Sequence, residues 1–147
     1  MNGPGVADVR RFWESHPLWS GESRFPEGSP EFFEEHRRVC IEDCFAGTLD
    51  GRFVPSGPGR GPVLDLGCGI GFWTVELGNA GCGPLCGADL TSRALELARR
   101  RCALTGVAAS FTQQNAENLG FKTGVFSHVN CQGVIHHTPD TRGAVAE

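Results

Sequence analysis

The stretch "VLDLGCGIGFW", residues 63–73, places three glycines at alternate positions directly after a short apolar run. An apolar run of this length, bounded by glycine, is typical of a buried strand. Gly67, Gly69 and Gly71 then predict a tight loop whose backbone comes close to a ligand of nucleotide type. The order of the glycines decides which nucleotide that would be.

Short apolar runs alternate with helical segments from the loop onward. Strands are predicted at 62–66, 84–90, 108–114 and 124–135, and helices at 72–81 and 92–106. Strands that alternate with helices favour parallel β-α-β units with helices on both faces of the sheet. We therefore predict an α/β fold, a Rossmann-like doubly wound parallel sheet.

The first 61 residues lack this alternation. A helix is predicted over 31–45 and stops near Gly47, since Ser29 suits the N-cap and Pro30 the first helical position. Residues 50–61 form a turn-rich linker. We expect an N-terminal helical cap and linker over 1–61 and a ligand-binding core over 62–147. The helix either lies over the pocket, with the aromatic residues Phe12, Trp13 and Trp19, or covers the sheet.

Composition narrows the class of protein. The chain has 147 residues, 39% of them hydrophobic, and a formal net charge of −4, which is ordinary for a soluble globular domain. Its one basic cluster, residues 99–101, falls where a helix should end and would complement the helix dipole. Without clustered positive charge, we expect no nucleic-acid partner. No apolar run is long enough to span a membrane, so we expect no membrane partner.

The seven cysteines are odd in number and irregularly spaced. This pattern favours reduced thiols and a cytoplasmic protein over a disulfide framework. Two C-x3-C pairs do not have the spacing of a zinc site, and we predict no metal.

The glycine loop does not fit a dinucleotide fingerprint. That fingerprint is G-x-G-x-x-G/A, and its third small position falls on Phe72. Asp65 at the end of the strand would repel a pyrophosphate but suit a cationic ligand. A phosphate-free nucleotide that carries positive charge, such as S-adenosylmethionine, fits better. A nicotinamide- or flavin-dependent oxidoreductase is the remote alternative.

Four blocks carry a resemblance to a known family: "VLDLGCGIG" (63–71), "GADLT" (87–91), "QNAENLGF" (114–121) and "GVIHHTPD" (133–140). In this order they resemble class I S-adenosylmethionine-dependent methyltransferases of the small-molecule type, related to the ubiquinone and menaquinone methyltransferases. The resemblance implies S-adenosylmethionine as the cofactor and methyl transfer to a small-molecule acceptor.

The candidate cofactor-binding residues follow from the residues themselves and from the resemblance. Asp89 ends the second strand, where a carboxylate can accept from ribose hydroxyls, and Leu90 would then pack on the adenine. The resemblance implies that residues 115–117 line the adenine and that the backbone at 130–131 approaches the methionine part. The full set is Asp65, Gly67, Cys68, Gly69, Gly71, Asp89, Leu90, Asn115, Ala116, Glu117, Asn130 and Cys131.

His136 and His137 follow the fourth strand, at the edge where ligands of such sheets bind. Either could act as a general base, and both are therefore candidate catalytic residues. The alternative is that one stabilises the loop and the other packs against the next helix.

The sequence departs from the family pattern in three ways. Ser127 stands where members commonly have Asp, and Gly120 where they have Pro. The last three of the family's seven strands have no counterpart, so we expect a chain truncated at its C-terminus. Two consequences follow from that expectation. The chain could bind the cofactor without turning over, as an inactive fragment or binding module, and it could self-associate through the exposed fourth strand.

Overall fold

The centre of the computed structural model, which describes residues 3–55 and 61–147, is a parallel sheet of four strands. The strands are β1 (Val63–Leu66), β2 (Leu85–Asp89), β3 (Ala109–Gln113) and β4 (His128–Asn130), in the order β3-β2-β1-β4. Asp65 of β1 pairs with Gly87 on one side and with Asn130 on the other. The α/β fold class is confirmed, and the carboxyl ends of β1, β2 and β4 meet at one edge.

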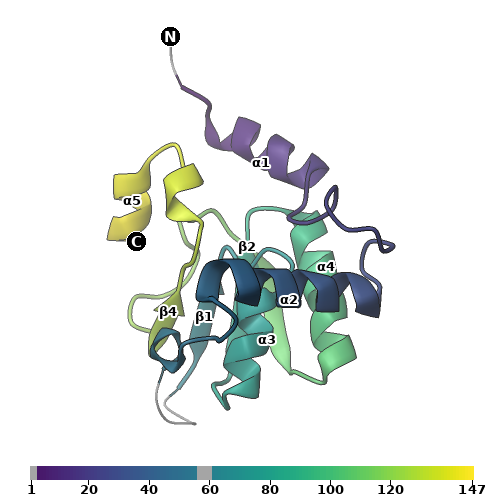
Figure 1. The fold of residues 1–147 in the computed structure, drawn as a ribbon. Helices are drawn as coiled ribbons and strands as arrows, with labels where there is room; N and C mark the ends of the chain where they lie inside the picture. Colours follow the sequence, from purple (N-terminus) through teal and green to yellow (C-terminus); the bar gives the residue numbers. More distant parts are fainter. Residues whose placement is uncertain (1–2, 56–60) are drawn as a thin grey trace.

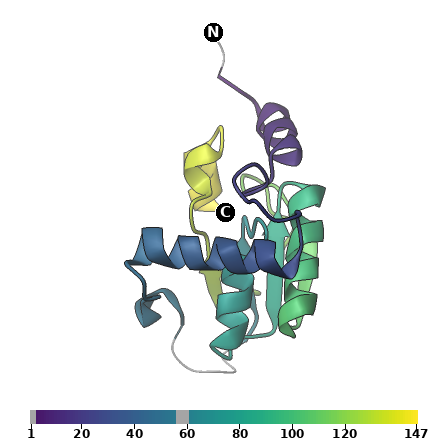
Figure 2. The same ribbon diagram turned by 45° about the vertical axis from the view of Figure 1, so that its right-hand side comes forward.

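Most of the helices lie on one face of the sheet, in two layers, and the short last helix lies near the carboxyl end of the sheet (Figures 1 and 2). The α-helices are α1 (Val6–Ser15), α2 (Pro30–Phe45), α3 (Phe72–Asn79), α4 (Ser92–Thr105) and α5 (Thr141–Ala146), and two short 3-10 helices are η1 (Gly51–Phe53) and η2 (Ile135–His137). In Figure 2, α2 crosses in front of α3, and α1 lies beyond the carboxyl ends of the strands.

The core explains why the apolar residues of β1 do not alternate with exposed polar ones. All four residues of β1 are buried. Val63 packs with Leu77 and Leu85 on the side of α3, whereas Leu64 and Leu66 belong to a second cluster, which Ala144 of α5 joins from the other face. A strand buried on both faces is typical of a parallel sheet.

The glycine loop after β1 owes its sequence to backbone conformation. Gly67, Gly69 and Gly71 all have positive φ angles, 68°, 50° and 81°, which glycine adopts without steric cost. Gly71 also caps α3, and a Cβ there would lie 3.1 Å from the Cα of Ala98 in α4. The third glycine therefore serves the close packing of α3 on α4.

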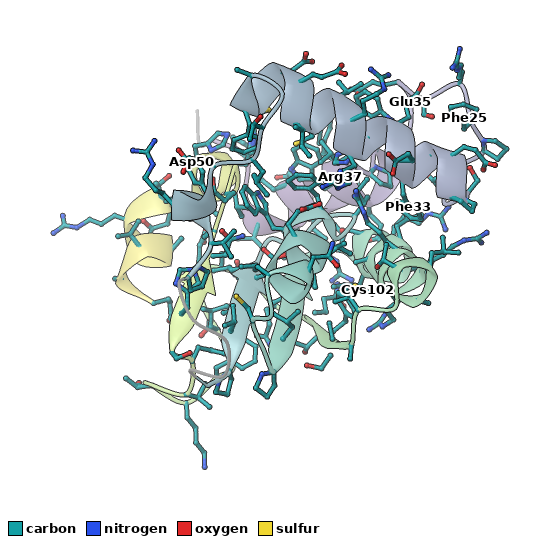
Figure 3. All side chains as sticks on the ribbon, turned by 60° about the horizontal axis from the view of Figure 1, so that its bottom comes forward. Phe25, Phe33, Glu35, Arg37, Asp50 and Cys102 are labelled. Carbon is teal, nitrogen blue, oxygen red and sulfur yellow. The ribbon has the colours of Figure 1, made fainter. Side chains whose placement is uncertain are left out.

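Helix α2 begins and ends as predicted but lies elsewhere than expected. The Ser29 hydroxyl accepts from the Phe32 amide at 3.2 Å, and Ala46 ends the helix in a left-handed conformation. The helix covers neither the sheet nor the pocket. It packs on α3 and α4, and the Arg37 guanidinium bonds the Glu76 carboxylate of α3 at 2.6 Å (Figure 3).

A buried polar contact joins α2 to α4. Arg101, only 2% exposed, donates to the backbone carbonyl of Phe33 at 3.3 Å and lies 3.3 Å from Nδ1 of His36. Burial first, and then the Arg101 charge, lowers the pKa of His36 to about 3. His36 is therefore neutral in the folded protein at neutral pH, with Nδ1 free to accept from the guanidinium.

Two elements differ from the sequence-based predictions. Helix α1 was not predicted, and β4 has three residues where a strand over 124–135 was expected. In the predicted linker, η1 occupies Gly51–Phe53, while residues 56–60 lie outside the described residues.

The buried, neutral His36 should make folding stability depend on pH. The unfolded chain binds a proton at this histidine below about pH 6.5, but the folded chain does so only near 3. The unfolded state therefore holds the extra proton between these values, and the free energy of unfolding should fall as the pH drops, by up to about 1.4 kcal/mol per pH unit. Denaturant titrations at neutral and acidic pH measure this slope.

In the variant His36→Gln this contribution should vanish, whereas His16→Gln, which removes an exposed histidine, should keep the wild-type slope. A wild-type slope in His36→Gln would contradict the account of a neutral buried imidazole.

Candidate functional site

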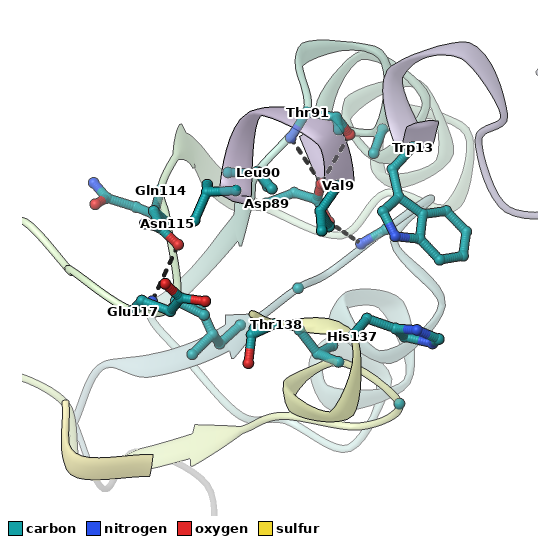
Figure 4. Close-up of a pocket in the computed structure, with 18 of the residues that line it drawn as sticks. Val9, Trp13, Asp89, Leu90, Thr91, Gln114, Asn115, Glu117, His137 and Thr138 are labelled. Atoms are coloured by element: carbon teal, nitrogen blue, oxygen red, sulfur yellow. Dashed lines mark hydrogen bonds between the residues drawn. The ribbon is translucent and has the colours of Figure 1, made fainter. Parts of the chain in front are cut away.

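A cavity of about 180 Å³ opens at the carboxyl edge of the sheet. Its floor comes from the end of β1 and the glycine loop, one wall from residues 114–117 and another from the segment after β4 (Figure 4). Helix α1 covers the cavity on the side opposite this floor. Open α/β sheets bind ligands at this edge, so the cavity is the candidate site.

Gly67 and Gly69 line the cavity, as predicted for the loop. A Cβ built on Gly69 would meet no atom within 4 Å, so that its backbone faces open space. Cys68 and Gly71 do not line the cavity. Cys68 is buried in a cluster with Leu95 and Ala98, and Gly71 serves the contact between α3 and α4.

Asp89 is fixed at the centre of the site by three hydrogen bonds (Figure 4). Its Oδ2 accepts from the Gly69 amide at 2.9 Å, and its Oδ1 accepts from the amide and hydroxyl of Thr91 at 2.9 and 2.8 Å. A carboxylate has about four lone-pair positions. One position is thus left for a ligand, and Asp89 is already oriented before any ligand binds.

Asp65 points away from the cavity. It is 2% exposed and accepts from the Thr74 hydroxyl at 2.6 Å and from the Asn130 side-chain amide at 2.8 Å. Burial raises the pKa of its carboxyl to about 6 against these hydrogen bonds. Its side chain joins β1 to α3 and β4, and the predicted direct contact with a ligand has no support in its position.

The wall formed by residues 114–117 combines apolar and polar groups. On this side the cavity is lined by Leu90, Gln114, Asn115, Ala116 and Glu117. The side-chain oxygen of Asn115 accepts from the Glu117 amide at 3.1 Å, and Glu117 Oε1 accepts from the Asp140 amide at 2.8 Å. These bonds hold the turn in place, and the predicted residues Leu90, Asn115, Ala116 and Glu117 do meet at one cavity.

The segment after β4 forms part of the cavity wall. Asn130 is buried against Asp65, and Cys131 packs on the core cluster beside Leu64 and Leu66. Residues 132–134 line the cavity in their place. Contact of the backbone at 130–131 with a ligand stays a prediction.

The two histidines are not equivalent. His137 lines the cavity and packs its ring edge-to-face on Trp13, with centroids 5.4 Å apart. Burial, and then the neighbouring His136, lowers the pKa of His137. The His136 ring lies 3.9 Å from that of His137, but among the described residues His136 is not part of the lining.

Sequence reasoning missed the helical character of α1, which brings Val6, Val9 and Trp13 to the cavity. Their spacing of three and then four residues is the signal of one helical face. Of the aromatic residues expected over the pocket, only Trp13 lies there. Phe12 is exposed beside it, and Trp19 packs with Phe32 and Phe33 under α2.

Charge limits what the cavity can bind. Asp89 and Glu117 line it, and among the described lining residues none is lysine or arginine. In the described part of the chain, no cluster of three or more His, Cys, Asp or Glu could hold a metal ion, and no helix is long and apolar enough to cross a membrane. The site therefore suits a neutral or cationic organic ligand.

Comparison with known proteins agrees with this geometry. The family described as methyltransferase domain matches residues 63–147, more than half of the chain. The chain is 31% identical over 101 residues to the ubiquinone biosynthesis O-methyltransferase of Bordetella avium, covering 68% of this chain and 38% of that protein. It is 33% identical over 85 residues to the enzyme of that name from Aromatoleum aromaticum, covering 57% and 36%. The chain thus spans little more than a third of the length of these relatives.

Solved structures share the fold. The YcgJ protein of Bacillus subtilis is 30% identical, with a TM-score of 0.57 over 61% of this chain and 38% of that one. Magnesium protoporphyrin IX methyltransferase from Synechocystis, solved with bound S-adenosylmethionine, is 20% identical, with a TM-score of 0.64 over 96% of this chain and 68% of that one.

Proposed function

The chain belongs to the methyltransferase-domain family, and we propose that it binds S-adenosylmethionine and serves methyl transfer to a small-molecule acceptor. Residues 62–147 would form the cofactor-binding core and residues 1–61 an N-terminal helical cap and linker, of which α1 covers the cavity. The names of its relatives, O-methyltransferases, point to a hydroxyl group as the accepting function.

One observation carries the proposal: the Asp89 carboxylate, held by Gly69 and Thr91, faces a cavity without lining cations. A dinucleotide or nucleoside phosphate needs positive charge or a cluster of free amides at its phosphates. A nucleoside that carries a positive sulfonium group instead needs a site without positive charge. The charge of this cavity supports S-adenosylmethionine and gives no support to a nicotinamide-dependent oxidoreductase.

The residues present fit that cofactor. Asp89 would accept from a ribose hydroxyl, Leu90 would pack on the adenine, and Asn115 and Glu117 would lie at the adenine edge. The open space over Gly69 leaves room for the cofactor against the loop. When bound, S-adenosylmethionine supplies a methyl group activated by sulfonium charge. The protein's task is then to position the acceptor and exclude water.

His137 is the better candidate for removing the acceptor's proton. It lines the cavity, and its lowered pKa keeps the imidazole neutral and able to take a proton at neutral pH. His136 would act only through its contact with His137.

The seven cysteines, all in the described residues, are free thiols. They suit a reducing compartment, and we propose the cytoplasm, which fractionation of producing cells would check.

The glycine loop provides the first test. Gly69→Ala and Gly106→Ala impose the same kind of strain, because both glycines have positive φ and a Cβ at either meets no atom within 4 Å. Gly69 lines the cavity, whereas Gly106 ends α4 on the surface. Both variants should lose similar stability, about 1–2 kcal/mol. Only Gly69→Ala should lose affinity for S-adenosylhomocysteine in calorimetry. Equal affinities in the two folded variants would remove the cofactor from this loop.

The histidines provide the second test, with transfer of a labelled methyl group to phenolic probe acceptors as the assay. His137→Gln should lower the transfer rate about 10²-fold or more, the range of a general base, and leave S-adenosylhomocysteine affinity near the wild-type value. His136→Gln, the control beside it, should transfer at close to the wild-type rate. Equal transfer rates in the two variants would exclude His137 as the base.

We also propose that the chain self-associates through β4. Within the described residues β4 pairs only with β1, and Val129 of β4 is exposed, as is Val125 in the segment before the strand. A free apolar edge favours strand pairing between molecules. Sedimentation velocity should show association that rises with concentration. Val129→Lys should reduce it, while Val145→Lys on exposed α5 should not. A monomer at every concentration would contradict the proposal.

A further inference from the structure

Helix α1 covers the cavity while burying none of its own residues. Its inner face contributes Val6, Val9 and Trp13 to the lining, Glu14 is half-buried, and the rest of the helix is exposed to solvent. Figure 4 shows Val9 beside Asp89, with Trp13 next to them on the right. An element with so little buried surface opens at low cost.

The side chain of Glu14 joins α1 to the start of α4. Glu14 accepts three hydrogen bonds at the start of α4: from the Ser92 amide at 3.0 Å, from the Ser92 hydroxyl at 2.5 Å and from the Arg93 amide at 3.1 Å. The hydroxyl of Ser92 and these amides lower the pKa of the Glu14 carboxyl. Its negative charge also suits the positive end of the α4 dipole.

Helix α4 needs this carboxylate because its own cap is engaged elsewhere. Thr91 stands at the N-cap, but its side chain makes no capping bond and donates instead to Asp89. The threonine that orients the proposed ribose-binding carboxylate thus leaves the first amides of α4 without a local acceptor. Glu14, from a distant part of the sequence, takes that role.

The cavity is small for the proposed ligand, which gives α1 a role in ligand entry and exit. At about 180 Å³ it is smaller than the roughly 300–1,000 Å³ of ordinary ligand pockets. A ligand as large as a nucleoside joined to an amino acid needs α1 to move before it can enter or leave. We propose that α1 is a lid and Glu14 its latch, a positioning residue that sets how often the site opens. This inference rests on the proposed function for the identity of the ligand.

Loss of the latch should change rates more than affinity. The Glu14 hydrogen bonds hold α1 over the site in the ligand-free protein and form again over the bound ligand, for which the cavity walls move apart, so both entry and exit depend on the open fraction. Loss of a helix cap corresponds to a roughly 2- to 30-fold change in an equilibrium. Glu14→Ala should therefore raise the association and dissociation rate constants of S-adenosylhomocysteine together, within that range, and leave their ratio nearly unchanged.

Stopped-flow binding of S-adenosylhomocysteine to the full chain measures both rates. Glu96→Ala is the matched control, because Glu96 is exposed on α4 and pairs with the side chain of Arg93 without touching α1. The control should keep wild-type rates. A rise in the dissociation rate alone, or no change in either rate, would overturn the latch.

Hydrogen exchange of the ligand-free chain tests the latch without the cofactor. Glu14→Ala should speed exchange of the α1 amides and of the first amides of α4, whereas Glu96→Ala should not speed exchange in α1. Unchanged α1 exchange in Glu14→Ala would overturn the proposal. Should the wild-type chain fail to bind S-adenosylhomocysteine, the proposed function falls, and exchange alone decides the latch.

Discussion

The hydrogen bond from the Gly69 amide to the Asp89 carboxylate is the contact on which the site depends. It ties the loop after β1 to the end of β2, at the edge where the two parallel strands finish. The loop can present that amide only because Gly67, Gly69 and Gly71 take left-handed conformations. The carboxylate is thereby oriented in advance, and a ligand need not bear the cost of ordering it.

The Asp89 carboxylate also links the site to helix α1. Because Thr91 is occupied with Asp89, the N-terminus of α4 is capped from α1 by Glu14. The helix so held brings Trp13 against His137. The proposed ribose position, the cap of α4 and the proposed base are thus joined through short contacts, while the buried pair His36 and Arg101 fastens α2 to the C-terminal half of α4.

The sequence allowed the glycine loop, Asp89 and the order of strands and helices to be predicted, since these rest on backbone conformation and on the alternation of apolar runs. It did not reveal which way Asp65 points. A residue at a strand end can face the edge or a neighbouring layer, and Thr74 and Asn130, distant in sequence, hold this one inward. The sequence likewise did not reveal that the Asn130 side chain is buried against Asp65, and contact of the backbone at 130–131 with the cofactor stays a prediction.

Other failures have other causes. The spacing of Val6, Val9 and Trp13 contained the signal for α1, but Pro and Gly residues around it favoured an irregular segment. The arginines at 99–101 were expected at the end of the helix, where they would complement its dipole, but α4 continues to Thr105. A helix turns about 100° per residue, so Arg101 lies with Leu97 on the buried face while Arg99 and Arg100 are exposed.

Calorimetric titration of S-adenosylhomocysteine into the Asp89→Ala variant tests the central claim most directly. Loss of the charge-assisted hydrogen bond to the ribose should weaken binding by about 1.5–3 kcal/mol relative to the wild-type chain. Asp43→Ala, which removes an exposed carboxylate of α2, should bind as the wild type does. A folded Asp89→Ala protein with wild-type affinity would show that the ribose lies elsewhere and would contradict the account.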